Sequence, residues 1–82
     1  SIERRIARMW LWAEENPPQL TSVTQMSMWT RSMGNFLLKI NPGLRCGLGR
    51  SETNDLQLQI SPNRKVELVS LVERIVDAAP EF

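Results

Sequence analysis

The stretch NPGLRCGLGRSETNDLQLQI, residues Asn41–Ile60, carries the only strand pattern in this 82-residue chain and therefore decides the fold. Leucines, Cys46 and an isoleucine alternate with polar residues or glycines on both sides of a polar loop over Arg50–Asn54. Strict alternation is typical of strands with one buried and one solvated face. The loop has the length and composition of a hairpin connection. The stretch thus predicts a β-hairpin with strands over Leu44–Gly49 and Asp55–Ile60.

The glycines of this stretch do not match a phosphate-binding loop. The spacing of Gly43, Gly47 and Gly49 is not GxGxxG, no GK[ST] follows, and the segment reads as a strand. We interpret Gly43 as permitting a left-handed turn after the preceding helix. Gly47 and Gly49 are typical of a bulge or of close approach by other backbone.

Helical periodicity fills the chain on both sides of the hairpin. The pattern predicts a helix over Ile2–Glu15, which ends at Asn16 because the residue before a proline avoids the α region. A second helix begins after a capping box at Ser22–Gln25 and runs to about Ile40, and a third runs from about Arg64 to Ala78. The residues expected to face the core are Ile2, Ile6, Met9, Trp10 and Ala13, then Val23, Met26, Trp29, Met33, Phe36, Leu37 and Ile40, then Val66, Val69, Val72, Ile75, Val76 and Ala79.

These elements predict an α+β fold in the order α-α-β-β-α, formed by one small domain over residues 1–82. The helices should cover the apolar face of the hairpin. Gly34 interrupts the second helix, and we expect it to admit close packing of the first helix. Hydrophobic content of 41% and charged content of 23% fit an ordinary globular protein.

Charge and cysteine content indicate which partners and which compartment the sequence favours. Ten basic and nine acidic residues give a net charge of +1, so there is no general attraction to nucleic acid or to anionic membranes. Cys46 is the only cysteine, which excludes an intrachain disulfide and predicts a reducing, cytoplasmic location. It lies on the apolar face of its strand, which favours a small buried hydrophobe over a nucleophile. No apolar run approaches the roughly 20 residues that span a bilayer.

No catalytic, cofactor or metal motif is present in the sequence. The chain has no histidine and no tyrosine, which removes the commonest general base and most nucleophile–base pairs. One cysteine without histidine makes a zinc site implausible. The nearest carboxylate pair at helical spacing, Glu73 and Asp77, is expected to be solvated surface. We therefore predict that the protein has no catalysis of its own and needs no cofactor.

Four residues are the candidates for contact with a partner: Trp12, Arg45, Gln57 and Gln59. Trp12 points about 200° away from Trp10 around the helix. Either the prolines after the helix or a neighbouring element covers it, or a partner does. The other three candidates, together with Arg50, would form a weakly basic polar sheet face without an aromatic stacking platform, which disfavours nucleic acid there.

Basic residues gather at the start of the chain. Arg4, Arg5 and Arg8 lie in the first two turns of the first helix, where the helix dipole disfavours positive charge. The cluster is either ordinary solvated surface or a basic patch for an acidic partner.

Four short motifs together resemble a known family. Met9–Asn16 resembles a W-x-W-x-x-x-N helix opening, Ile40–Leu44 an I-x-P-G-L strand entry, Leu58–Ser61 a strand ending in I-S, and Val72–Pro80 a V-E-x-(L/I)-V-x-A-A-P helix end. Their order is similar to an uncharacterised family of small bacterial α+β proteins, a domain of unknown function. The resemblance implies no assigned catalytic residues. It also implies further sheet after the last motif, so we expect that the chain to Phe82 is either a truncated form or a shortened variant of the family.

The unpaired edges of a two-stranded sheet suggest the function. We expect a protein-interaction module that acts through an open sheet edge and apolar helix surface, in a homo- or hetero-oligomer. A homodimer in which two hairpins extend one sheet is one form of it. One alternative is a fragment of a small enzyme or ligand-binding domain whose functional residues lie beyond Phe82. A second alternative is a weak nucleic-acid binder on the polar sheet face.

Overall fold

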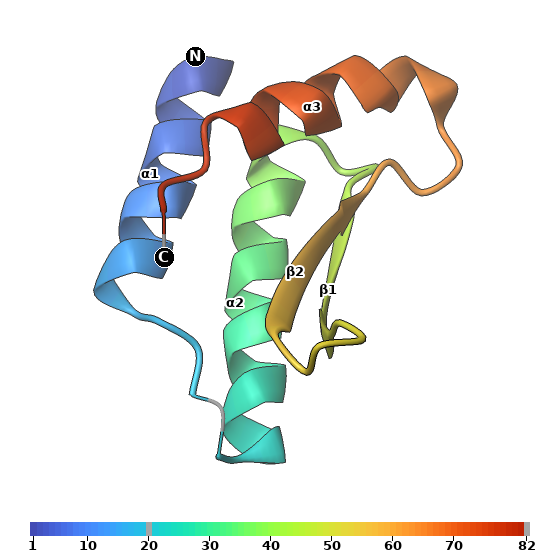
Figure 1. The fold of residues 1–82 in the computed structure, drawn as a ribbon. Helices are drawn as coiled ribbons and strands as arrows, with labels where there is room; N and C mark the ends of the chain where they lie inside the picture. The colour runs from blue at the N-terminus through green and yellow to red at the C-terminus, as the bar shows by residue number, and fades with distance from the viewer. Residues whose placement is uncertain (20, 82) are drawn as a thin grey trace.

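A computed structural model describes residues 1–19 and 21–81 and confirms the α+β order α-α-β-β-α (Figure 1). The central helix has the first helix on one side and the hairpin on the other, and the last helix crosses over the end of all three. The elements are α1 (Ile2–Glu15), α2 (Val23–Ile40), β1 (Arg45–Arg50), β2 (Leu56–Ser61), a 3-10 turn η1 (Val66–Leu68) and α3 (Val69–Asp77).

Helices α1 and α2 have the bounds that the sequence predicts, and a serine caps the start of each. The Ser1 hydroxyl accepts a hydrogen bond from the Arg4 amide, and the Ser22 hydroxyl accepts one from the Gln25 amide. Three predicted core residues are wrong: Ile2 and Val23 are exposed in the first turn of their helices, and half-buried Met26 lies outside the core. The buried residues of the two helices are Ile6, Met9, Trp10, Ala13, Trp29, Met33, Leu37 and Ile40.

The third helix starts later than predicted. Asn63 has φ of 53° and Arg64 has φ of 65°, so the chain is left-handed where the helix was expected to begin. The 3-10 turn follows, and α3 starts only at Val69. The later start changes which face is buried: Leu68 and Ile75 enter the core, Leu71 and Val72 are half-buried, and the predicted core residues Val66, Val69, Val76 and Ala79 are exposed.

The hairpin has the two faces that its alternation predicts. Its strands pair antiparallel without a bulge, from Arg45 opposite Ser61 to Arg50 opposite Leu56. The apolar face of Cys46, Leu48, Leu58 and Ile60 packs against the core. Leu44, predicted as the first strand residue, instead precedes β1 and is buried, with 1% of its surface exposed.

The glycines act differently from their predicted roles. Gly43 has no positive φ; instead, a Cβ atom there would stand 2.7 Å from Leu68 Cδ1, so the turn needs glycine for space. Gly34 faces Cys46 of β1 rather than α1, with 3.9 Å between its Cβ position and Sγ. At Gly47 and Gly49 no neighbouring atom of the described residues lies within 4 Å of the Cβ position, so neither glycine marks a close contact.

Side-chain donors join the three helices at their carboxyl ends, where backbone carbonyls lack intrahelical partners. Trp10 Nε1 of α1 donates to the Ile75 carbonyl of α3 at 2.9 Å, in a buried position. Arg5 Nη1 donates to the Lys39 carbonyl of α2 at 2.7 Å. Trp29 Nε1 of α2 donates to the carbonyl of Asn16, the residue that ends α1, at 2.6 Å. The Glu3 carboxylate forms an ion pair with Arg74.

Gly43→Ala should destabilise the fold, by roughly 1–3 kcal/mol in the free energy of unfolding, because the added methyl group overpacks the turn against buried Leu68. Gly47→Ala is the matched control, since its methyl group enters open space and should be neutral or slightly stabilising. Urea unfolding followed by tryptophan fluorescence measures both. Equal stability of the two variants would contradict the steric role of Gly43.

Trp10→Phe should cost more stability than Trp29→Phe. The first change leaves the buried Ile75 carbonyl without its indole donor, which costs roughly 1–3 kcal/mol. The second change removes the donor of a part-buried bond to the carbonyl of Asn16, an exposed residue whose carbonyl can bond to water instead. Thermal unfolding by circular dichroism compares the two variants, and the reverse order would show that the Trp10 bond does not hold α3.

Candidate functional site

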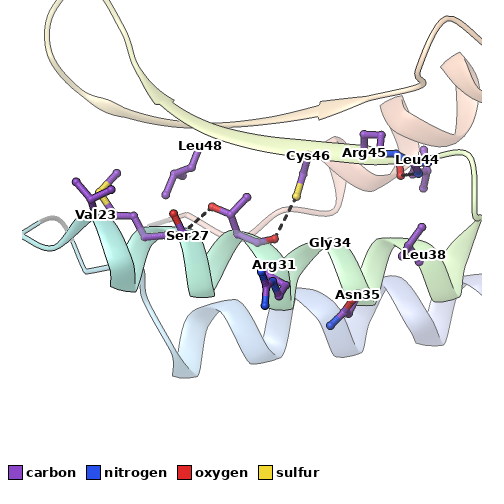
Figure 2. A pocket seen from close by; sticks show the side chains of 12 residues that line it. Val23, Ser27, Arg31, Gly34, Asn35, Leu38, Leu44, Arg45, Cys46 and Leu48 are labelled. Atoms are coloured by element: carbon purple, nitrogen blue, oxygen red, sulfur yellow. Dashed lines mark hydrogen bonds between the residues drawn. The ribbon is translucent and has the colours of Figure 1, made fainter.

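A groove of about 660 Å³ lies between α2 and β1 (Figure 2). Its floor is the face of α2 that α1 does not cover, and its wall is the strand β1 with Leu44, which precedes it. The lining residues are Val23, Met26, Ser27, Thr30, Arg31, Gly34, Asn35, Leu38, Leu44, Arg45, Cys46 and Leu48.

The groove exposes apolar side chains that the fold does not bury. Val23 is 82% exposed and Leu38 is 46% exposed, although both lie on the helix that forms the centre of the domain. Leu48 of β1 points toward α2 from the opposite wall (Figure 2). Burying such side chains stabilises a complex by about 1.5–3 kcal/mol each. The groove therefore favours an apolar occupant.

Cys46 lines the groove and contacts α2. Its Sγ lies 3.6 Å from the Thr30 carbonyl of α2, in a weak hydrogen bond (Figure 2). Burial raises the pKa of the Cys46 thiol above its ordinary value of 9.0, because the thiolate would lose its hydration. The half-buried thiol is therefore neutral near pH 7, as the sequence predicts, and it lines the groove as a small apolar group.

The charged residues of the groove are all basic. Arg31 of α2 and Arg45 of β1 line it, and there is no acidic residue among its lining residues. Arg45 folds back on its own turn, where Nη1 donates to the carbonyls of Pro42 and Leu44 at 2.9 and 2.8 Å. A guanidinium has five donors, so both arginines keep donors for a carboxylate.

The backbone of β1 offers hydrogen-bonding groups to the groove. In residues 1–19 and 21–81 the sheet consists of β1 and β2, so the other edge of β1 is unpaired. Just beyond the last strand pair, the Ser51 amide donates to the Asp55 carbonyl at 2.8 Å. Hydrogen-bonded pairs alternate along an antiparallel ladder, so Gly49 and Gly47 bond to β2. The N–H and C=O groups of Cys46, Leu48 and Arg50 therefore point outward.

Cys46 and Leu48 thus contribute both their side chains and their backbone groups to the groove. Their side chains lie on the apolar face of the sheet, and their backbone groups lie on its open edge. A strand placed beside β1 would bond to those backbone groups and, at the same time, lay alternate side chains over α2.

The structure separates the sequence-predicted contact residues. Trp12 is half-buried against α2, with ring centroids 5.8 Å from Trp29 and 5.4 Å from Phe36, so a neighbouring element covers much of it. Gln57 and Gln59 are exposed on the outer sheet face, away from the groove. Of the four candidates, only Arg45 lines the groove.

Sequence reasoning missed Arg31 and Leu38 of the groove, and it assigned Val23 and Met26 to the core. The signal was present in the breadth of the α2 apolar stripe, which is wider than one neighbouring helix can cover. Periodicity alone does not show which part of such a stripe stays open.

Other kinds of site are not seen in the part of the chain that the structure describes. Across residues 1–19 and 21–81 no three side chains of the metal-ligating types His, Cys, Asp or Glu come together. The same residues form no helix with the length and apolar character to cross a bilayer.

Comparison with protein-family models, with curated proteins and with solved structures finds no match for this chain. The resemblance to an uncharacterised bacterial family therefore stays a prediction, and the groove is interpreted from its own chemistry.

Alkylation of Cys46 should be slow in the folded protein. At pH 8 the raised pKa keeps the thiol protonated, and only the thiolate reacts with iodoacetamide. The rate should be well below that of the same chain unfolded in urea and should rise as the pH is raised past 9. Because the folded pKa lies above the unfolded one, stability from this group is full below the unfolded pKa and is lost as pH rises through the folded pKa. Equal alkylation rates for the folded and unfolded chain would contradict this environment.

Proposed function

We propose that this chain is a protein-interaction module that binds an extended segment of another protein in the groove between α2 and β1. The bound segment adds as a third strand to the open edge of β1 and lays its apolar side chains over α2. In this proposal the chain binds and carries out no reaction. We also propose the cytoplasm as its location, because a chain with one cysteine and no intrachain disulfide suits a reducing compartment.

The observation that carries the proposal is that an unpaired strand edge and exposed apolar side chains lie in the same groove. The outward N–H and C=O groups of β1 lack a strand partner among the described residues, and exposed Val23 and Leu38 of α2 lie in the same groove. An extended segment gives both features a partner, since its backbone bonds to the edge while alternate side chains face the helix. A docked helix would bury the apolar side chains but would leave the edge unpaired.

The charge of the groove indicates the chemistry of the partner. Arg31 and Arg45 are its charged lining residues, and the strand β1 carries no acidic residue. A segment with apolar residues at alternating positions and carboxylates near its ends fits this lining. A second copy of this chain would offer β1, which carries Arg45 and Arg50, or β2, which is uncharged. Neither supplies the carboxylates, so we propose an acidic partner rather than a homodimer.

A short peptide tests the proposal directly. The probe is a fluorescein-labelled peptide with valine alternating with threonine and a glutamate at each end, followed by fluorescence anisotropy. Leu38→Glu should reduce its affinity by about tenfold or more, equivalent to about 1.4 kcal/mol, because a carboxylate replaces an apolar contact in a site that favours acidic segments. The matched control is Leu11→Glu, since Leu11 is 56% exposed on α1 and does not line the groove.

Charge reversal separates acidic from non-specific apolar binding. Arg31→Glu should weaken the glutamate-ended peptide and strengthen a lysine-ended one, because the variant residue then complements the opposite charge. Equal binding of both peptides by both proteins would overturn the acidic partner. If the chain self-associates in competition with the peptide, and Leu38→Glu abolishes the self-association, the occupant of the groove is a second copy. That result would also overturn the acidic partner.

A further inference from the structure

A second hollow, of about 290 Å³, lies where α1 and α2 run side by side (Figure 1). Arg5 and Arg8 line it from α1, and Phe36 and Lys39 line it from α2. Each pair is spaced by three residues, which places its two side chains on the same face of a helix. Three cations and one aromatic ring therefore converge on one site, apart from the groove that carries the proposed function.

Two of these cations are held in place. Arg5 Nη1 donates to the Lys39 carbonyl at 2.7 Å, which fixes the guanidinium at the carboxyl end of α2. Lys39 Nζ lies 5.8 Å from the centre of the Phe36 ring, within the range of a cation–π contact. The remaining donors of Arg5 and the ammonium of Lys39 stay available to a ligand.

Among residues 1–19 and 21–81, no carboxylate lines this hollow. Glu3 is the carboxylate nearest to Arg5 and Arg8 in the sequence, and it forms an ion pair with Arg74 instead. The chain as a whole carries only +1, so three converging cations are a strong local excess. Like charges that line the same small hollow repel one another and weaken the fold, and a bound anion would offset that repulsion.

We propose that this hollow binds a phosphate group carried on a small molecule with an apolar or aromatic part. Two guanidinium groups can each bond two oxygens of one phosphate, and the lysine adds a point charge. The Phe36 ring supplies an apolar wall beside those donors. This site lies on other residues than the groove, so the two proposals stand or fall separately.

Thermal unfolding and calorimetric titration with two probes test the site. Inorganic phosphate and phenyl phosphate at pH 7.5 are compared with sodium chloride at matched ionic strength, which reproduces general screening. Both probes should raise the melting temperature above the chloride control. Phenyl phosphate should bind more tightly, because its ring can pack on Phe36. Tighter binding of inorganic phosphate would overturn the organic ligand.

The matched variants are Arg8→Gln and Arg64→Gln, which remove the same charge from exposed positions inside and outside the hollow. Arg8→Gln should weaken both probes by about tenfold or more, the loss of a charge-assisted hydrogen bond. It should also raise the melting temperature without ligand, since one of three repelling cations is gone. Arg64→Gln should leave phosphate binding unchanged. Equal phosphate affinity in both variants, or a phosphate effect no larger than that of chloride, would overturn the site.

Discussion

The hydrogen bond from the Trp10 indole to the Ile75 carbonyl is the contact on which the rest of the arrangement depends. Helix α3 is short and has no side-chain cap at its start, so its own backbone gives it little stability. The indole gives one carbonyl at its carboxyl end a partner in a buried position. With α3 held against α1, Leu68 and Ile75 can close the core over Gly43, and α3 meets β2. The hairpin is thereby held at both the α2 and the α3 side.

That arrangement leaves α2 incompletely covered. Helix α1 takes one of its sides and the hairpin takes another, but two strands are too narrow to reach across the whole remaining face. The exposed part keeps the apolar character of a core face, while the edge of β1 keeps outward N–H and C=O groups. The groove is thus a direct consequence of a sheet with two strands on a helix with a broad apolar stripe.

The sequence predicts the elements well and their contacts less well. Alternation over Leu44–Ile60 gives the correct faces, and the proline after Asn16 and the capping box at Ser22–Gln25 give the correct end of α1 and the correct start of α2. The start of α3 was missed because two residues in a row are left-handed there: asparagine tolerates that conformation at position 63, but nothing in the sequence marks Arg64 as left-handed. The groove was missed for a different reason: a periodic stripe shows that a face is apolar, and only tertiary contacts show whether it is covered.

Amide hydrogen exchange along β1, followed residue by residue by NMR, tests the open edge most directly. In the free protein the amides of Gly47 and Gly49 should be protected by β2, while those of Cys46 and Leu48 exchange rapidly. Addition of the glutamate-ended strand peptide should protect the Cys46 and Leu48 amides as well. Strong protection of those two amides in the free protein, or no gain on adding the peptide, would contradict an open edge that binds a strand.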